Sequence, residues 1–306
     1  MEYVVQTFGL SKKYARQTVV DQVNMNIRKG DIYGFVGENG SGKTTIIRMI
    51  TGLIRPTAGT IRLFGVDHKD PKVYVARRKM GAVVETPAIC LNMTAKENLM
   101  HQAQILGLQD DDKVQTILAK VGLQDVVNSK KLAGNFSLGM RQRLGIAMAL
   151  MGDPEFLILD EPMNGLDPAG IVEIRELILA LHRQGITLLI SSHILTELSL
   201  VATNYGIISK GKLLQEVTAT ELRNCTGKQL LLRAQDSEAL AAFVRTQLPD
   251  TPVSLVDDVV KISGDVDLNS LLKAAIDGGN RLESVVSKET GFEEYYMNLL
   301  GGSKYA

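Results

Sequence analysis

The sequence has 306 residues and carries 34 basic and 34 acidic side chains, so its formal net charge is zero. This length suits one large domain and a smaller one, and the balanced charge argues against a general polyanion-binding surface. Two cysteines, Cys90 and Cys225, are too few for a disulfide framework and fit a reducing compartment.

Neither a signal peptide nor a membrane span is expected. The first residues, Met1 to Val5, lack a basic segment followed by a long apolar one. No apolar run approaches the ~20 residues that cross a bilayer. We therefore expect the chain to be soluble by itself, so that a partner supplies any membrane span.

The larger, N-terminal part of the chain alternates strand-like and helix-like patterns. Alternating apolar and polar residues predict antiparallel strands at its start, joined by a loop at residues 10–14. Short apolar runs predict buried strands, and apolar residues at helical spacing predict helices. Strands are expected at residues 2–8, 17–28, 31–36, 61–64, 80–85, 156–159 and 186–190, with a hairpin across Lys210 and Gly211. Helices are expected at residues 45–53, 169–183 and 194–203. Residues 94–133 are also helical in pattern, with breaks at Gly107 and Gly122, and a further helix is expected to begin after the segment 135–143 and to end at about Met151.

The C-terminal part follows a different order. Its pattern is strand, helix, two strands, helix and strand, which resembles a small split βαβ sandwich. The strands are expected at 229–233, 253–256, 258–262 and 281–287, and the helices at 237–248, 267–277 and, last of all, 291–299.

The phosphate-binding pattern G-x-x-x-x-G-K-T runs from Gly37 to Thr44. A predicted strand precedes it and a predicted helix follows it, and this context weighs against a chance Gly-rich turn. Glycines let the backbone curl so that successive N–H groups point at an anion, and the helix beginning near Lys43 adds its positive N-terminal end. Lys43 is then expected to reach the β- and γ-phosphates, and the Thr44 hydroxyl to ligate Mg²⁺.

Two carboxylates follow another predicted buried strand, residues 156–159. Acidic residues at strand ends are common in structural roles, but in a chain with a phosphate loop upstream they predict a metal site. Asp160 is expected to support Mg²⁺, and Glu161 to activate a water molecule.

Tyr14 has a ring that could stack on a nucleotide base, although a single tyrosine in a loop is usually a surface residue.

Further motifs complete a resemblance to the nucleotide-binding subunit of ATP-binding cassette (ABC) transporters, over residues 1 to about 218. Residues 136–142 are similar to the family signature L-S-G-G-Q-x-Q, and residues 164–168 are similar to its D-loop. His193 resembles the switch histidine of the family. Tyr14 lies where the family carries its adenine-stacking aromatic residue.

The resemblance implies the fold and the domains. The fold is an α/β fold of the P-loop NTPase type, with a RecA-like sheet, an antiparallel β subdomain and an inserted helical subdomain. The ATP-binding domain is expected at residues 1–218, with the helical subdomain at about 86–152. Residues 219–306 are expected to form a small accessory α+β domain.

The resemblance also implies the site, with ATP and Mg²⁺ as cofactors. The catalytic residues that it implies are Glu161, His193 and Lys43, and the metal ligands are Thr44, Asp160 and Glu85. Nucleotide contacts are implied for the adenine-stacking position, the phosphate loop, the signature and the D-loop: Tyr14, Gly37, Glu38, Asn39, Gly40, Ser41, Gly42, Lys43, Thr44, Thr45, Ser137, Gly139 and Asp167.

Two motifs depart from the family pattern. In the signature, Leu138 and Met140 replace a glycine and a glutamine, but Ser137 and Gly139 are kept, so we expect function to survive. Glu85 stands where the family usually has the glutamine of the Q-loop. A glutamate here, the signature and the C-terminal extension are similar to the subgroup that exports bacitracin-like and lantibiotic peptides. Drift at one position is the alternative explanation of Glu85.

The implied protein is the ATP-hydrolysing subunit of an ABC exporter in bacteria. Family members work as head-to-tail dimers, so that Ser137 and Gly139 of one subunit cap the ATP held by the other. The implied partners are membrane-spanning permease subunits, received in the cleft near residues 85–100, and a second ATPase subunit, identical or not. No nucleic acid is expected, and the expected location is the cytoplasmic face of the cell membrane.

Other functions carry less weight. An exporter of the ABC-2 type with different cargo is the first alternative, because the permease mainly chooses the cargo. A non-transport ABC ATPase is the second, but translation factors usually carry two cassettes and chromosome ATPases a long coiled coil. A non-catalytic binding module is disfavoured by Glu161 and His193, and an importer by Glu85 and the C-terminal domain.

Overall fold

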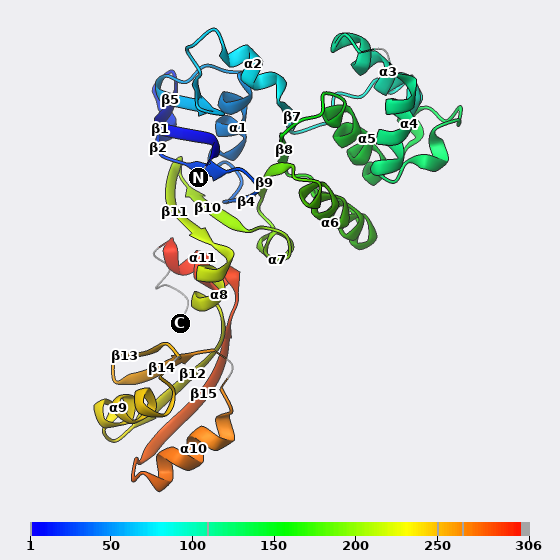
Figure 1. Ribbon diagram of the computed structural model, residues 1–306. Helices are drawn as coiled ribbons and strands as arrows, with labels where there is room; N and C mark the ends of the chain where they lie inside the picture. Colours follow the sequence, from blue (N-terminus) through cyan, green and yellow to red (C-terminus); the bar gives the residue numbers. More distant parts are fainter. Residues whose placement is uncertain (1, 109, 250, 265, 301–306) are drawn as a thin grey trace. The chain divides into compact units, whose positions relative to one another are not determined.

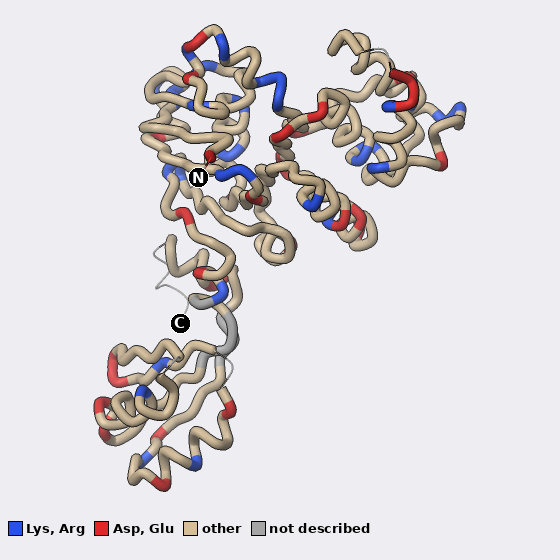
Figure 2. The backbone as a smooth tube through the Cα atoms, in the orientation of Figure 1, with Lys and Arg blue, Asp and Glu red and all other residues tan. Residues whose placement is uncertain are grey.

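The computed structural model describes residues 2–300 apart from Gln109, Asp250 and Asp265 (Figure 1). The chain divides into two compact units, Met1–Val217 and Thr218–Ala306, and the boundary expected between residues 218 and 219 lies beside this division. Basic and acidic residues are interspersed over both units (Figure 2). Among the described residues, no helix has both the length and the apolar character needed to cross a bilayer.

An antiparallel sheet forms the N-terminal part of the first unit. Its strands follow the order β2-β1-β5-β6, and β3 also pairs with β1. The strands are β1 (Tyr3–Tyr14), β2 (Gln17–Val23), β3 (Asn26–Arg28), β5 (Ala58–Leu63) and β6 (Val66–Asp67). The loop predicted at residues 10–14 is wrong, because β1 continues through Tyr14 by shifting its register against β2. The chain turns only at Ala15, whose φ is 50°.

The central sheet of the first unit is mainly parallel, and its middle strands are buried. The strand order is β11-β10-β4-β9-β8-β7. The strands are β4 (Ile32–Val36), β7 (Met80–Val83), β8 (Phe156–Asp160), β9 (Thr187–Ser192), β10 (Asn204–Ser209) and β11 (Lys212–Thr218). Every residue of β4, β8 and β9 is buried. This confirms the buried strands predicted from continuous apolar runs, a pattern typical of parallel sheets.

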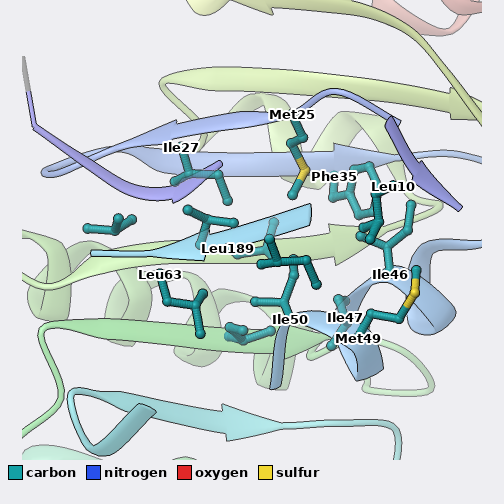
Figure 3. Packing of buried hydrophobic residues seen from close by; sticks show 14 of the residues in the cluster. Leu10, Met25, Ile27, Phe35, Ile46, Ile47, Met49, Ile50, Leu63 and Leu189 are labelled. Atoms are coloured by element: carbon teal, nitrogen blue, oxygen red, sulfur yellow. The ribbon is translucent and has the colours of Figure 1, made fainter. Parts of the chain in front are cut away.

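Helix α1 (Lys43–Thr51) packs between the two sheets. Figure 3 shows its apolar side chains among those of both sheets, and Ile46, Ile47 and Ile50 are fully buried. The other labelled members of this core are Leu10, Met25, Ile27, Phe35, Met49, Leu63 and Leu189. Burial of one such side chain stabilises the fold by about 1.5–3 kcal/mol. The core therefore fixes the start of α1 relative to the end of β4.

Helices α3 (Ala95–Ile105), α4 (Asp111–Lys120) and α5 (Leu138–Leu150) pack on one another between β7 and β8 in the chain. Thr94 caps α3 in a capping box with Glu97, and Asp110 caps α4. The prediction of helix up to residue 133 is wrong, because the backbone after α4 turns at Gly122 (φ 71°). Two short 3₁₀ turns follow instead, η1 (Gln124–Val126) and η2 (Ala133–Asn135).

Two other helices of this unit differ in extent from the expectation, and one was not expected. Helix α5 begins at Leu138 rather than after residue 143, since the Ser137 hydroxyl accepts a hydrogen bond from the Met140 amide and caps it. Helix α7 (Leu195–Ser199) ends before residue 203, whose amide bonds to the Ile32 carbonyl of β4 instead. Helix α2 (Val73–Arg78) was not predicted. Helix α6 (Pro168–Arg183) agrees with the predicted helix and begins after the cap Asp167.

The second unit is a four-stranded antiparallel sheet with helices. Its strands follow the order β13-β14-β12-β15. The elements are α8 (Ala219–Cys225), β12 (Gly227–Ala234), α9 (Ser237–Gln247), β13 (Val253–Val256), β14 (Val259–Ser263), α10 (Leu268–Asp277), β15 (Leu282–Thr290) and α11 (Phe292–Leu299). Leu232 and Val260 of the sheet form a core with Leu240 of α9 and Leu271 of α10. The predicted strand and helix order is confirmed; only α8 was missed.

Candidate nucleotide-binding site

The carboxyl ends of the parallel strands bring the predicted site residues together. The register pairs Val36 with Ser192 across β4 and β9, and Asp160 with Ser191 across β8 and β9. It also pairs Val83 of β7 with Leu159 of β8. The phosphate loop, His193, Glu161 and Glu85 therefore all leave the same edge of the sheet, where open α/β sheets bind their ligands.

The phosphate loop has the backbone shape that binds an anion. Gly40 and Gly42 have left-handed φ values of 80° and 109°, which glycine adopts without strain. A Cβ on Gly37 would lie 2.5 Å from the Ile208 carbonyl oxygen, so only glycine fits there. The loop ends at the N-terminus of α1, where free N–H groups and the helix dipole favour phosphate.

Lys43 is buried at the centre of this loop, with only 5 % of its surface exposed. Its ammonium donates hydrogen bonds to the carbonyl oxygens of Gly37 at 2.6 Å and Glu38 at 3.2 Å. It also lies 3.3 Å from Glu161 Oε1. A buried ammonium with these partners is fixed in place beside the loop amides, so it can contact a phosphate bound by them.

Glu161 lies between two of the predicted catalytic residues. Its Oε2 is 2.7 Å from His193 Nδ1, and its other oxygen faces Lys43. The backbone at Glu161 is left-handed, with φ 52°, a conformation that costs a non-glycine residue about 1–3 kcal/mol and is found at functional sites. The amide of Glu161 donates to Ser191 Oγ at 2.9 Å, which holds this turn.

The donor atoms present fit Mg²⁺. In the described part of the chain, three of the five buried side-chain atoms that lack a hydrogen-bond partner lie in this site: Ser41 Oγ, Asp160 Oδ2 and Glu161 Oε1. Asp160 is 1 % exposed, and its other oxygen accepts a 2.5 Å bond from Ser191 Oγ. No group of three or more His, Cys, Asp or Glu suited to a metal occurs among the described residues. Mg²⁺ does not need one, because it takes one or two carboxylates together with substrate phosphates.

Glu85 has a different partner from the other predicted metal ligands. Its Oε1 lies 2.8 Å from Arg48 Nη2 of helix α1, and both side chains are partly exposed. Its backbone is left-handed, with φ 56°. A metal that takes Glu85 Oε1 as a ligand would therefore have to displace Arg48.

Tyr14 lies at the end of β1 and is 45 % exposed. The Lys12 ammonium stands 5.0 Å from the centre of its ring. The hairpin that carries Tyr14 leads into β2, and the Val19 carbonyl of β2 would lie 3.1 Å from a Cβ on Gly42 of the phosphate loop. The ring is thus on a hairpin whose second strand touches the phosphate loop.

The signature and the D-loop lie together. A hollow of about 470 Å³ is lined by residues of both, including Ser137, Gly139 and Asp167, and by none of residues 37–44. Ser137 caps α5, while the Asp167 carboxylate accepts a 3.1 Å bond from the Gly170 amide and caps α6. These three predicted nucleotide-contact residues therefore line one hollow together, and the phosphate loop of their own chain does not line it.

Sequence reasoning missed two residues of the site. Ser191 bonds both Asp160 and the Glu161 amide, and it is fully buried. Its position at the end of a predicted buried strand, next to His193, was the available signal. Arg48 carried no signal, because it belongs to no motif and lies at an ordinary helical position.

The comparisons with known proteins agree with this geometry. The family model described as "ABC transporter" matches residues 20–164. The bacitracin transport ATP-binding protein BcrA of Bacillus licheniformis is 41 % identical over 99 % of this chain and 99 % of its own length. The lantibiotic transport ATP-binding protein SrtF of Streptococcus pyogenes is 42 % identical over 68 % of this chain and 88 % of its own length.

Solved structures show the same fold. An ATP-binding cassette of an ABC transporter in its ADP conformation superposes with a TM-score of 0.65 at 26 % identity, covering 73 % of this chain and 94 % of that one. The ATP-binding subunit of another ABC transporter gives a TM-score of 0.63 at 28 % identity, covering 72 % and 92 %.

Proposed function

The chain belongs to the family of ABC transporter ATP-binding proteins, and from this premise we propose that it drives export of bacitracin-like or lantibiotic peptides in resistance or immunity. It is an ATP-binding subunit and an ATPase. ABC ATP-binding subunits dimerise and work with membrane permease components. The likeness to BcrA over the full chain, C-terminal unit included, is the observation that carries the cargo proposal.

ATP is held by the phosphate loop and by the ring of Tyr14. The loop amides of residues 37–45, with the Lys43 ammonium, bind the phosphates, and Tyr14 stacks on the adenine. Thr44 and Asp160 would hold Mg²⁺, with Glu85 as a further ligand, and the ion would neutralise charge on the phosphates. Of these residues, Asp160 has a buried oxygen, Oδ2, that lacks a hydrogen-bond partner, and this supports its place in the assignment.

Hydrolysis depends on Glu161 and His193. Glu161 polarises the attacking water, and the imidazole of His193, 2.7 Å from the carboxylate, keeps it in register with the γ-phosphate. Lys43 faces the other carboxylate oxygen and the loop carbonyls. Positioning and charge stabilisation therefore supply most of the catalysis, as in phosphoryl transfer generally.

The second half of each site comes from another ATPase subunit, identical or not. Ser137, Gly139 and Asp167 lie around one exposed hollow. The start of α5 at Ser137 is a helix N-terminus that can meet the γ-phosphate of an ATP held by the opposite subunit. A head-to-tail dimer then closes two composite sites.

A groove beside the Glu85 loop receives the permease. Its volume is about 550 Å³, and it is lined by residues 86–88 and by parts of α2, α3 and α5. Arg77 and Arg78 line it, and within the described residues neither makes an ion pair. Figure 2 shows this basic run at the end of α2. A cytoplasmic segment of the permease with acidic residues would complement this groove, and we propose that the chain acts at the cytoplasmic face of a bacterial membrane.

The domain assignment is part of the proposal. Residues 1–218 bind and hydrolyse ATP, with residues 86–152 as the helical subdomain, and residues 219–306 form an accessory domain. The division of the structure after Val217 supports the boundary.

Resistance measurements test the proposal. The chain is co-expressed with its permease partner in a sensitive host, as wild type or as Glu161→Gln, and minimum inhibitory concentrations are measured for bacitracin, a lantibiotic and a β-lactam. We expect the wild type alone to raise resistance to one of the peptides and not to the β-lactam. Equal sensitivity of the two strains to both peptides would favour an exporter of other cargo or a non-transport ATPase.

A further inference from the structure

We infer that Arg48 is a positioning residue for Glu85, and that its ion pair competes with the loaded nucleotide site for the Glu85 carboxylate. Arg48 Nη2 donates to Glu85 Oε1 at 2.8 Å. The inference rests on the proposed role of Glu85 as a metal ligand and adds the residue that controls access to that role.

Helix geometry places Arg48 one turn away from Thr44. They are four positions apart in the sequence, so they share one face of α1, and side chains at this spacing have Cβ atoms about 5–6 Å apart. Both are half-buried, whereas the intervening Ile46 and Ile47 are fully buried in the core. A long side chain on a helix leans toward the N-terminus. Arg48 thus shares a helix face with Thr44 while its guanidinium binds Glu85 Oε1.

The backbone of Glu85 indicates a residue held in place by its side chain. Val83 of β7 pairs with Leu159 of β8. Glu85 lies two residues after Val83 and Glu161 two residues after Leu159, and both have left-handed φ values, 56° and 52°. Glu161 is held by Lys43, Ser191 and His193. In the described part of the chain, Arg48 is the one side-chain partner of Glu85. Such a backbone persists only when its surroundings hold it.

The ion pair is also weak enough to be exchanged. The Arg48 side chain is 39 % exposed and that of Glu85 is 55 % exposed. Pairs exposed to this extent contribute little to folding stability, because water and salt screen them and ordering the side chains costs entropy. A divalent cation close to Thr44 can therefore compete with Arg48 for the same carboxylate.

Metal binding without turnover tests the inference. The full chain is loaded with AMP-PNP, and Mn²⁺ is titrated while free Mn²⁺ is followed by electron paramagnetic resonance. Arg48→Met removes the competitor and keeps an apolar stem, so the apparent Kd for Mn²⁺ should fall about two- to fivefold, the range of one exposed ion pair. Arg48→Lys keeps the charge and should stay near wild type, and Arg48→Gln should repeat the result of Arg48→Met.

The decisive control is the Glu85→Gln background. There the neutral amide forms no ion pair, so adding Arg48→Met should not tighten Mn²⁺ binding further. Equal tightening in both backgrounds would mean a general effect of removing a positive charge, and would overturn the inference. No change or weaker binding in Arg48→Met would overturn it as well. The assay contains neither permease nor cargo, so a failed resistance measurement leaves this result standing.

Discussion

His193 Nδ1 lies 2.7 Å from Glu161 Oε2, so the imidazole contacts the carboxylate that follows strand β8. The other oxygen of Glu161 is 3.3 Å from Lys43 Nζ, and the side chain of Glu161 is only 20 % exposed. The carboxylate is thus held at both oxygens by residues from two other segments of the chain. An oriented carboxylate of this kind suits a group that must polarise one water molecule at a fixed position.

Replacing Glu161 by glutamine should abolish turnover and preserve ATP binding. Glutamine keeps the shape of the side chain but not its basicity, so we expect the ATPase rate to fall by about 10²-fold or more. The variant should accumulate as an ATP-bound dimer on gel filtration. Glu176→Gln, on the exposed side of α6, is the matched control. Near-wild-type turnover in Glu161→Gln would refute the assignment of Glu161.

Replacing His193 by alanine should slow hydrolysis more than it weakens nucleotide binding. Without the imidazole, Oε2 of Glu161 loses its partner and the carboxylate turns toward Lys43. A misplacement of about 1 Å can cost about 10²-fold in rate, so kcat should fall to that extent. Single-turnover rates and binding of a fluorescent ATP analogue separate the two quantities. A change in binding alone would instead assign His193 to nucleotide affinity.

Mixing two inactive variants should restore activity. Lys43→Ala destroys the phosphate loop of its own chain, and Ser137→Arg blocks the signature surface that faces a partner. A mixed dimer keeps one intact composite site, so ATPase activity should recover on mixing the purified variants. Each variant alone and a mixture of two Lys43→Ala samples serve as controls. Full activity of a monomer at high dilution would exclude the composite site.

Glu85→Gln should lower antibiotic resistance by a larger factor than it lowers the ATPase rate of the isolated subunit. Glutamine offers a carbonyl acceptor and an NH₂ donor, whereas a carboxylate is an acceptor only and carries a full charge. A partner on the permease that matches the carboxylate would be lost. Glu85→Ala should harm both activities. Unchanged resistance in Glu85→Gln would indicate drift at this position and would remove one support of the cargo proposal.

Gly206→Ala should destabilise the first unit. A Cβ at Gly206 in β10 would lie 2.1 Å from the Tyr33 hydroxyl oxygen, and that hydroxyl donates a 2.8 Å bond to Glu216. Burial, and next the Glu216 carboxylate, raise the pKa of Tyr33 well above its usual range, so the donor stays protonated. Overpacking of this kind costs about 1–3 kcal/mol.

Denaturant unfolding followed by circular dichroism measures the cost of Gly206→Ala. The same substitution in a Tyr33→Phe background is the control, because the closest atom is then absent and the cost should be smaller. Equal costs in the two backgrounds would assign the destabilisation to the ring carbons Cζ and Cε1 of residue 33, which would lie 2.7 and 2.8 Å from the added Cβ, or to the strand backbone, rather than to the hydroxyl.

Local patterns predicted where the phosphate loop lies, between a strand and a helix, and that Asp160 and Glu161 stand at the end of a buried strand. Backbone torsions within a few residues set the shape of a Gly-rich turn between a strand and a helix. A continuous apolar run in the sequence predicts a short buried strand such as β8. The order of strands and helices in the C-terminal unit was predictable for the same reason.

Only the tertiary structure decided which of these residues meet. Ser191 bonds Asp160 because the register of β8 and β9 pairs these two residues. Arg48 of α1 bonds Glu85, which follows β7. Strand β1 continues through Tyr14 because β2 pairs with it. The contacts of Ser191 and Arg48 join segments far apart in the chain, whereas β1 and β2 form a local hairpin. Their geometry depends on how the sheets pack around the core formed with α1, and a local pattern carries no information about that packing.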